Sequence, residues 1–243
     1  MVPRFFCPQP LAAGGLCVLP EAAAHHAGRV LRLAPGDAVC VFDGRGGEYA
    51  GRIDGGGREL RCRILAHDPI EREAPVAITL VQALPSGERM DWLVQKAVEL
   101  GVAAIVPVLA ERCVVRLSGE RAARRRAHWR QIAVSACEQC GRNRIPEVAP
   151  VVALGDFLAE SGKPGDLRLL LDPQAGRSLR TLPATAPMGV VLLAGPEGGF
   201  VEAERRAAAE CGFRALTLGP RVLRAETAGL AATAALLARW GDY

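Results

Sequence analysis

Apolar runs and amphipathic stretches alternate along residues 76–243, and this alternation predicts strands that are separated by helices. The expected strands are residues 77–84, 102–109, 166–172, 190–194 and 215–218. Helices are expected at residues 88–100, 118–140 and 227–240. Because the strands are almost continuously apolar, we expect a parallel sheet covered on both faces, which is typical of an α/β fold.

The first part of the chain has a different pattern, with short runs in which apolar and polar side chains alternate. Residues 39–43 and 48–53 flank the glycine-rich segment Gly44–Gly47, which predicts a β-hairpin. Residues 60–65 predict a half-buried strand with basic side chains on one face, and residues 21–31 predict a short helix. Short strands at this spacing indicate a small β-barrel.

A charged segment with two prolines, residues 67–75, separates the two patterns and predicts a domain boundary near residue 72. We therefore expect a small β-domain at residues 1–72 and an α/β domain at residues 73–243. The 243 residues are 50% hydrophobic, which is enough to bury a substantial core and argues against global disorder.

Arginine dominates the basic residues of this chain, whose net charge is +4. Lys occurs twice among the 30 basic residues, which leaves 28 Arg. Codon bias explains an even excess, whereas Arg that serves bidentate phosphate binding would cluster. Nine lie within residues 111–144, although those at residues 121–126 fit a solvated helix face. The arginines that we expect to face nucleic acid, with ordinary surface charge as the alternative, are Arg4, Arg29, Arg32, Arg142 and Arg144.

The eight cysteines do not indicate a secreted disulfide framework, because the first ten residues lack the apolar core of a signal peptide. The longest apolar stretch, residues 228–238, is shorter than the ~18–20 residues that a membrane helix needs. We therefore expect a cytoplasmic protein with reduced thiols and no membrane association. Cys137 and Cys140 form a C-x-x-C pair without a second pair, so we expect no metal site.

Two glycine-bearing loops of the second domain each lie between a strand and a helix. Gly195–Gly199 follows residues 190–194, and Gly219–Pro220 follows residues 215–218. Ligands of open α/β sheets bind beyond the carboxyl ends of strands, so we expect both loops to line one pocket. Neither G-x-x-x-x-G-K-[ST] nor a G-x-G-x-x-G after a strand occurs, which argues against P-loop chemistry and against a dinucleotide-dependent dehydrogenase.

The motif GPEGGF at residues 195–200, followed by LGPRVLRAETA at residues 218–228, resembles the 16S ribosomal RNA (uracil-N3) methyltransferases of the SPOUT class. The likeness extends over essentially the whole chain. Ser86 departs from the family, which often has a basic residue at this position; if that residue holds RNA, a nearby Arg must replace it. Further segments similar to the family are residues 26–37, 89–101, 111–113 and 136–146.

The resemblance implies a PUA-like RNA-binding β-domain, a SPOUT domain with a trefoil-knotted parallel sheet, and a homodimer. It also implies S-adenosylmethionine as the methyl donor and 16S rRNA, within the small ribosomal subunit, as the substrate. The final helix is apolar on almost all sides, which suits burial in a core or in a dimer interface. The residues that we expect to bind the cofactor are Gly195, Pro196, Glu197, Gly198, Gly199, Leu218, Gly219, Leu223 and Thr227.

Methylation at uracil N3 makes two demands on the site. The imide N–H is a poor nucleophile until it loses its proton, so a general base or cationic donors should assist. N3 also lies on the Watson–Crick edge, so the base must be unpaired or flipped out. We predict that Arg224 stabilises the uracil anion, while Glu226 orients the base or accepts the proton. The alternative is a structural role for both residues, with Glu226 at the start of the last helix.

The sequence also allows two other functions. One is a SPOUT methyltransferase that acts on another base or another RNA, which the cofactor motifs alone allow. The other is an RNA-binding protein that has lost catalysis. The full-length likeness argues against the first, and the intact cofactor loop argues against the second.

Overall fold

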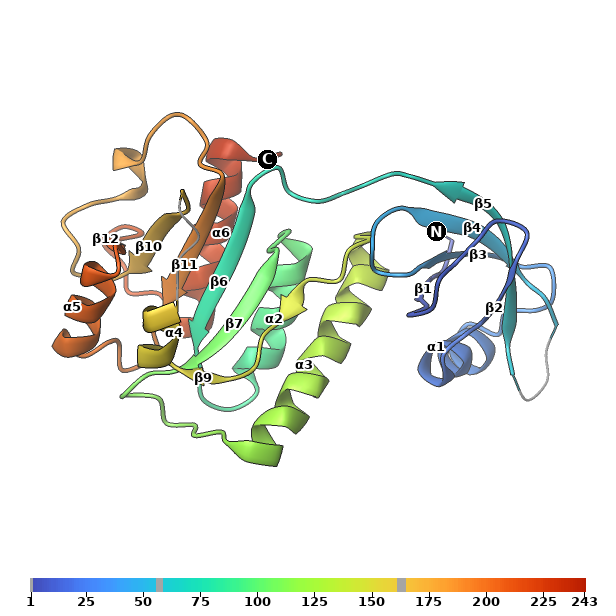
Figure 1. Cartoon of the computed structure of the whole chain (residues 1–243), viewed down its shortest axis with the longest axis horizontal. Helices are drawn as coiled ribbons and strands as arrows, with labels where there is room; N and C mark the ends of the chain where they lie inside the picture. The colour runs from blue at the N-terminus through green and yellow to red at the C-terminus, as the bar shows by residue number, and fades with distance from the viewer. Residues whose placement is uncertain (1, 56–58, 161–164) are drawn as a thin grey trace. The chain divides into compact units, whose positions relative to one another are not determined.

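The computed structural model describes residues 2–55, 59–160 and 165–243, which divide into two compact units (Figure 1). The first unit comprises the residues up to Glu73 together with Val134–Ile145. The second comprises Ala74–Ala133 and Pro146–Tyr243. Helix α3 (Gly119–Cys140) therefore begins in the second unit and ends in the first. Nothing in the hydrophobic pattern indicates that the end of this helix packs with the N-terminal strands.

The first unit contains a five-stranded sheet in the order β1-β3-β4-β5-β2. β3 and β4 pair antiparallel, which confirms the predicted hairpin. Along β5, Cys62 and Ile64 are buried while Arg61 and Arg63 are exposed, so the predicted alternation is also confirmed. The five strands are β1 (Arg4–Phe6), β2 (Leu16–Val18), β3 (Ala38–Phe42), β4 (Glu48–Ile53) and β5 (Arg61–Asp68).

The helix expected at residues 21–31 is present with a change of pitch. α1 (Glu21–His25) continues directly into the π-helical turn η1 (His26–Val30). Arg32 follows with a φ of +54°, a left-handed conformation that prevents a further helical turn. The wider turn contains Gly28, which lacks a Cβ and is a poor former of regular helix.

The second unit is built on a parallel sheet in the order β12-β10-β11-β6-β7-β8, with β9 paired to β7. Every pairing in this sheet is parallel, which confirms the α/β prediction. All six residues of β11 are buried because both faces of the central sheet are covered. The strands are β6 (Ala77–Ala83), β7 (Ala104–Leu109), β8 (Glu147–Val148), β9 (Val152–Ala153), β10 (Leu167–Leu171), β11 (Gly189–Ala194) and β12 (Arg214–Leu216).

The helices of the second unit connect these strands and cover the sheet (Figure 1). α2 packs against α6, which lies on β6 and β11, and α4 packs against α5. Over the ranges that the structure describes, no helix combines the length and the apolar character needed to cross a membrane. The helices are α2 (Arg89–Glu99), α4 (Leu154–Glu160), α5 (Glu202–Glu210) and α6 (Ala225–Trp240), with a 3₁₀ turn η2 (Leu179–Thr181).

Candidate functional site

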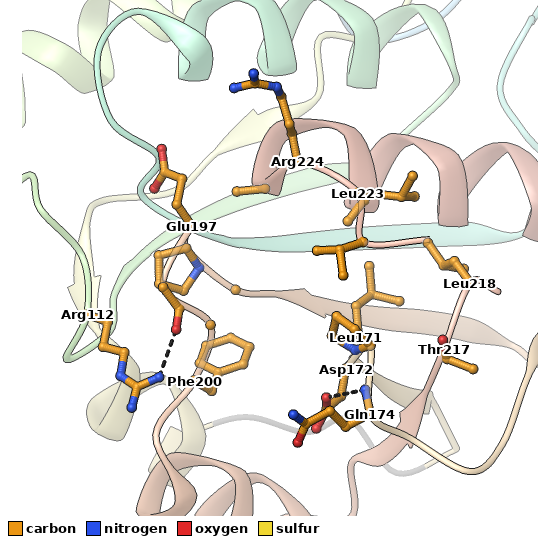
Figure 2. Close-up of a pocket in the computed structure, with 18 of the residues that line it drawn as sticks. Arg112, Leu171, Asp172, Gln174, Glu197, Phe200, Thr217, Leu218, Leu223 and Arg224 are labelled. Carbon is orange, nitrogen blue, oxygen red and sulfur yellow. Dashed lines mark hydrogen bonds between the residues drawn. The ribbon is translucent and has the colours of Figure 1, made fainter. Parts of the chain in front are cut away.

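A cavity of about 690 Å³ lies at the carboxyl ends of β10, β11 and β12. Its walls come mainly from the segments that follow these strands, residues 171–174, 195–200 and 216–225. β10 pairs with both β11 and β12, so the three loops are neighbours at one edge of the sheet. Figure 2 shows Asp172 and Gln174 on one side of the cavity and Arg224 on the other.

Most of the residues expected to bind the cofactor line this cavity. The exceptions are Gly219 and Thr227, and the proposed catalytic residue Glu226 also lies outside the lining. The expected residues that do line the cavity are Gly195, Pro196, Glu197, Gly198, Gly199, Leu218, Leu223 and Arg224. The two glycine loops therefore meet at one pocket, as their positions after two strands predict.

The first loop is a tight turn whose glycines allow close packing. The Gly199 N–H donates to the Pro196 carbonyl at 2.9 Å, and Gly199 has a φ of +68°. A Cβ at Gly198 would lie 3.1 Å from the Cβ of Arg112, so a larger residue would push the two segments apart. The Arg112 Nη1 donates to the Gly198 carbonyl at 2.9 Å, a bond drawn in Figure 2. This part of the loop is thus held by a backbone hydrogen bond and by Arg112.

The second loop connects β12 to α6 and places one arginine at a helix start. The Thr217 Oγ1 donates to the Gly219 carbonyl at 3.1 Å, which fixes the turn after the strand. Leu218 and Leu223 contribute apolar surface to the wall of the cavity. Arg224 is the N-terminal cap residue of α6, and its carbonyl accepts from the Thr227 N–H at 2.9 Å. The Arg224 side chain is exposed at the edge of the cavity.

Asp172 and Gln174 form a third wall that the sequence reasoning missed. The Gln174 N–H donates to the Asp172 Oδ1 at 2.9 Å, and the Asp172 N–H donates to the Leu216 carbonyl at 3.0 Å. Asp172 is the last residue of the predicted strand at residues 166–172, and Gln174 lies two positions further along the chain. A search for polar side chains at the carboxyl ends of all the strands would have found Asp172.

Glu197 of the first loop is held by the turn after β6. Its Oε1 accepts from the Ser86 N–H at 2.8 Å, from the Ser86 Oγ at 2.7 Å and from the Arg89 Nη1 at 2.5 Å. Burial raises the pKa of the Glu197 carboxyl, but these donors outweigh it and lower the pKa overall. Ser86 therefore anchors the Gly195–Gly199 loop through Glu197.

Glu226 faces Arg89 and is buried, with 9% of its surface exposed. Its Oε1 lies 3.7 Å from the Arg89 Nε. Its Oε2 is buried without a hydrogen-bond partner among the described residues. Arg89 itself lines the cavity, so one arginine contacts both Glu197 and Glu226. Glu226 therefore lies outside the cavity lining and contacts the lining residue Arg89.

The arginines expected to face RNA have different environments in the first unit. Arg142 is 3% exposed, and its Nη2 lies 2.5 Å from Glu73. Arg4 pairs with Glu48 at 2.5 Å, and Arg144 pairs with Glu71 at 3.0 Å. Arg29 and Arg32 are exposed, and no hydrogen bond or ion pair to another described residue holds either side chain. The side chains of Arg4 and Arg142 are largely buried and are paired with carboxylates of the first unit. They therefore have a structural role in that unit, which the sequence does not predict.

Glu48→Gln is expected to destabilise the first unit by about 1–3 kcal/mol at neutral pH, because Glu48 accepts hydrogen bonds from Arg72 and Arg4. Burial raises the pKa of this carboxyl, but the two arginines outweigh it and lower the pKa to about 2. Because the pKa of Glu48 in the folded protein is below the unfolded value of about 4.3, the stabilisation is complete above about pH 4.3 and is lost as the pH falls toward 2.

Hydrogen exchange of peptides from the first unit, measured at about pH 7 and about pH 3, tests this expectation. The difference in hydrogen-exchange protection between wild type and Glu48→Gln should be smaller at the lower pH. Glu71→Gln is the matched control, because the Glu71–Arg144 pair is exposed and should contribute less than about 1 kcal/mol. A Glu48→Gln effect that is the same at both pH values would contradict the assignment.

Comparison with known proteins identifies relatives over the full chain. Residues 72–237 match the family described as RNA methyltransferase domain, and residues 19–65 match the RNA methyltransferase PUA domain. A ribosomal RNA small subunit methyltransferase E from Buchnera aphidicola is 31% identical over 99% of this chain and 98% of its own length.

Among the described residues, no group of His, Cys, Asp or Glu side chains is arranged to hold a metal ion.

Two solved structures match the whole fold, and both contain a bound methyl donor. A ribosomal RNA small subunit methyltransferase E from Neisseria gonorrhoeae, bound to S-adenosyl methionine, is 40% identical with a TM-score of 0.93. A putative methyltransferase from Legionella pneumophila, in complex with the cofactor SAM, is 39% identical with a TM-score of 0.95. Each match covers 100% of both chains.

Proposed function

This chain belongs to the RNA methyltransferase family that includes the ribosomal RNA small subunit methyltransferase E proteins, and on that premise we propose that it methylates N3 of a uridine in 16S rRNA with S-adenosylmethionine as donor. The observation that carries the proposal is the cavity itself. It is walled by the Gly195–Gly199 turn and by residues 216–225, at the carboxyl ends of adjacent parallel strands. These segments carry the motifs GPEGGF and LGPRVLRAETA, which resemble the family.

The residues of the cavity fit the chemistry of this cofactor. The glycines of the first loop expose backbone groups, while Leu171, Leu218 and Leu223 offer apolar surface to a purine ring. The Asp172 carboxylate and the Gln174 amide supply polar partners for hydroxyl or ammonium groups. When bound, S-adenosylmethionine supplies a methyl group on a positively charged sulfur.

We propose that Arg224 acts on the base that receives the methyl group. Its guanidinium is exposed at the cavity edge, and no hydrogen bond or ion pair to another described residue holds it. A cation there stabilises the negative charge that develops on uracil as N3 loses its proton. Glu226 contacts Arg89, and we propose that it helps to hold this arginine at the edge of the cavity. Glu226 would accept the N3 proton only if the bound base reaches its carboxylate.

The N-terminal domain, residues 1–72, is proposed to bind the RNA around the target. The match of residues 19–65 to a PUA domain of RNA methyltransferases supports this role. Arg29 and Arg32 are the expected arginines whose side chains are exposed without an ion pair among the described residues. The ribosomal substrate is consistent with the expected cytoplasmic location. A homodimer and a small-subunit context follow from the family resemblance, and light scattering of the purified protein tests the dimer.

Nucleoside mass mapping of 16S rRNA from cells that lack this protein tests the function. Loss of 3-methyluridine at one site, restored by the wild-type gene but not by the Arg224→Ala gene, is the expected result. Loss of a different methylated nucleoside would favour the alternative of a SPOUT methyltransferase with another target. An unchanged set of methylated nucleosides in ribosomal and transfer RNA would contradict the catalytic proposal.

A further inference from the structure

Five arginines line the cavity, and their partners divide them into two groups. Three are held by acceptors of the protein: Arg89 by Glu197, Arg112 by the Gly198 carbonyl, and Arg205 by Glu202 and the Phe200 carbonyl. For Arg221 and Arg224, no partner in a hydrogen bond or an ion pair is found within the described part of the chain. The cavity arginines without a hydrogen-bond or ion-pair partner among the described residues therefore both lie in one segment of the wall, the loop that follows β12.

Arg221 is exposed and follows a turn that restricts the backbone before it. The residue follows Gly219-Pro220, and the proline fixes its own φ in the turn. The preceding turn is also held by the Thr217 Oγ1 bond to the Gly219 carbonyl. Arg221 and the next residue, Val222, are both exposed, and the Val222 side chain is 80% exposed. Arg221 thus follows a restricted turn and is exposed in the cavity lining, without a hydrogen-bond or ion-pair partner among the described residues.

The ligand chemistry that fits this position is a phosphodiester. A guanidinium binds phosphate oxygens through two parallel hydrogen bonds, and such contacts fix the register of a nucleic acid. RNA approaches the cavity from its open side, because the walls are occupied by protein. Two unpaired cations at residues 221 and 224 attract the backbone toward the same mouth.

We propose that Arg221 binds a backbone phosphate beside the target uridine and thereby positions the base against Arg224. This inference rests on the proposed function, because it assumes that RNA enters this cavity. Arg221 is a positioning residue that acts on the RNA backbone, whereas Arg224 acts on the base. The competing interpretation is that Arg221 binds the carboxylate of the methionine part of the cofactor.

The test compares Arg221→Ala, Arg221→Lys and the control Arg214→Ala. Arg214 is an exposed arginine at the start of β12, at the end of that strand opposite the cavity, so the control removes the same charge from the same unit. Binding to small ribosomal subunits that lack the methyl mark is measured between about 50 and 200 mM potassium chloride. Calorimetry gives the Kd for S-adenosylmethionine, and steady-state kinetics give kcat and KM.

Arg221→Ala is expected to raise the KM for the subunit about five- to tenfold and to reduce the slope of log K against log salt by about 0.7–0.9, which corresponds to one phosphate contact. The Kd for the cofactor should stay within about twofold, because the proposed contact is with the RNA and not with the cofactor. Arg221→Lys should keep the salt slope, because it keeps the charge. The slope for Arg214→Ala should equal that of wild type.

Two results would overturn the assignment. One is an unchanged salt slope and KM in Arg221→Ala. The other is an unchanged salt slope with a weaker Kd for the cofactor, which would place the guanidinium on the cofactor carboxylate. A wild-type protein that binds subunits without methylating them would instead defeat the proposed function. The difference in salt slope would still decide whether Arg221 contacts phosphate.

Discussion

Arg224→Ala is expected to lower kcat for methyl transfer by about 10²–10³-fold while leaving the Kd for S-adenosylmethionine within about twofold. The size of the effect follows from where the charge develops. Uracil N3 becomes nucleophilic as its proton leaves, and the resulting negative charge needs a fixed cation. Arg224 is the cap residue at the start of α6, so it also lies at the positive end of the helix dipole. Single-turnover assays at saturating cofactor measure the chemical step directly.

The controls for Arg224→Ala separate electrostatics from folding. Arg224→Lys keeps the charge without the planar fork, so it should recover part of the lost rate. Raising the pH should also recover part of the Arg224→Ala rate, because solvent then removes the N3 proton without the help of a cation. Near-normal turnover in Arg224→Ala would remove this residue from the mechanism.

Glu226→Gln is a second comparison for the same reaction. Its carboxylate contacts Arg89 and lies outside the cavity lining, so we expect a smaller loss of kcat than in Arg224→Ala. An equal or larger loss would identify Glu226 as the proton acceptor. The sequence places both residues in one tripeptide, Arg224-Ala225-Glu226, and therefore cannot separate their environments. The structure does so because residues on the first turn of α6 point in different directions.

The sequence predicts the long strands and helices of the second unit because their hydrophobic periods are regular, whereas the short elements β8, β9 and α4 are not predicted. It also predicts the two glycine loops as pocket walls, since both follow strands of one parallel sheet. It does not predict Asp172, Gln174, Arg89 or Arg112 as pocket residues. Asp172 and Gln174 reach the cavity because β10 lies between β11 and β12. Arg89 reaches it by contacting Glu197, and Arg112 by contacting Gly198. Strand order and loop contacts of this kind leave no signature in local periodicity.

The environments of the arginines depend even more on long-range contacts. Arg4 contacts Glu48 and Asn143, and Arg142 contacts Glu73, all in the first unit. The residues of each pair are far apart in sequence, so a count of basic residues cannot tell an internal ion pair from a free cation. Codon bias adds to the difficulty because it supplies arginine everywhere. The trefoil knot and the homodimer stay predictions from the family resemblance.

Gly199→Val is expected to weaken S-adenosylmethionine binding by about five- to thirtyfold, because it strains the backbone of the Gly195–Gly199 loop, which we propose binds the cofactor. Gly199 has a φ of +68°, where a β-branched residue is disfavoured by about 1–2 kcal/mol or more. No atom lies within 4 Å of a Cβ built at this position, so the expected cost comes from conformation and not from a clash. The strained loop would move the backbone groups of Gly195–Gly199 out of their positions in the cavity.

Gly199→Asn is the matched control, because asparagine tolerates the left-handed region and its Cβ also has open space. Calorimetry should give near-wild-type cofactor affinity for Gly199→Asn and weak affinity for Gly199→Val, with similar thermal midpoints showing that both variants fold. Equal weakening in the two variants would mean that any side chain here occupies the cofactor's space, and backbone strain would not be the cause. Unchanged affinity in both would show that this loop does not hold the cofactor, although Gly199 lines the cavity.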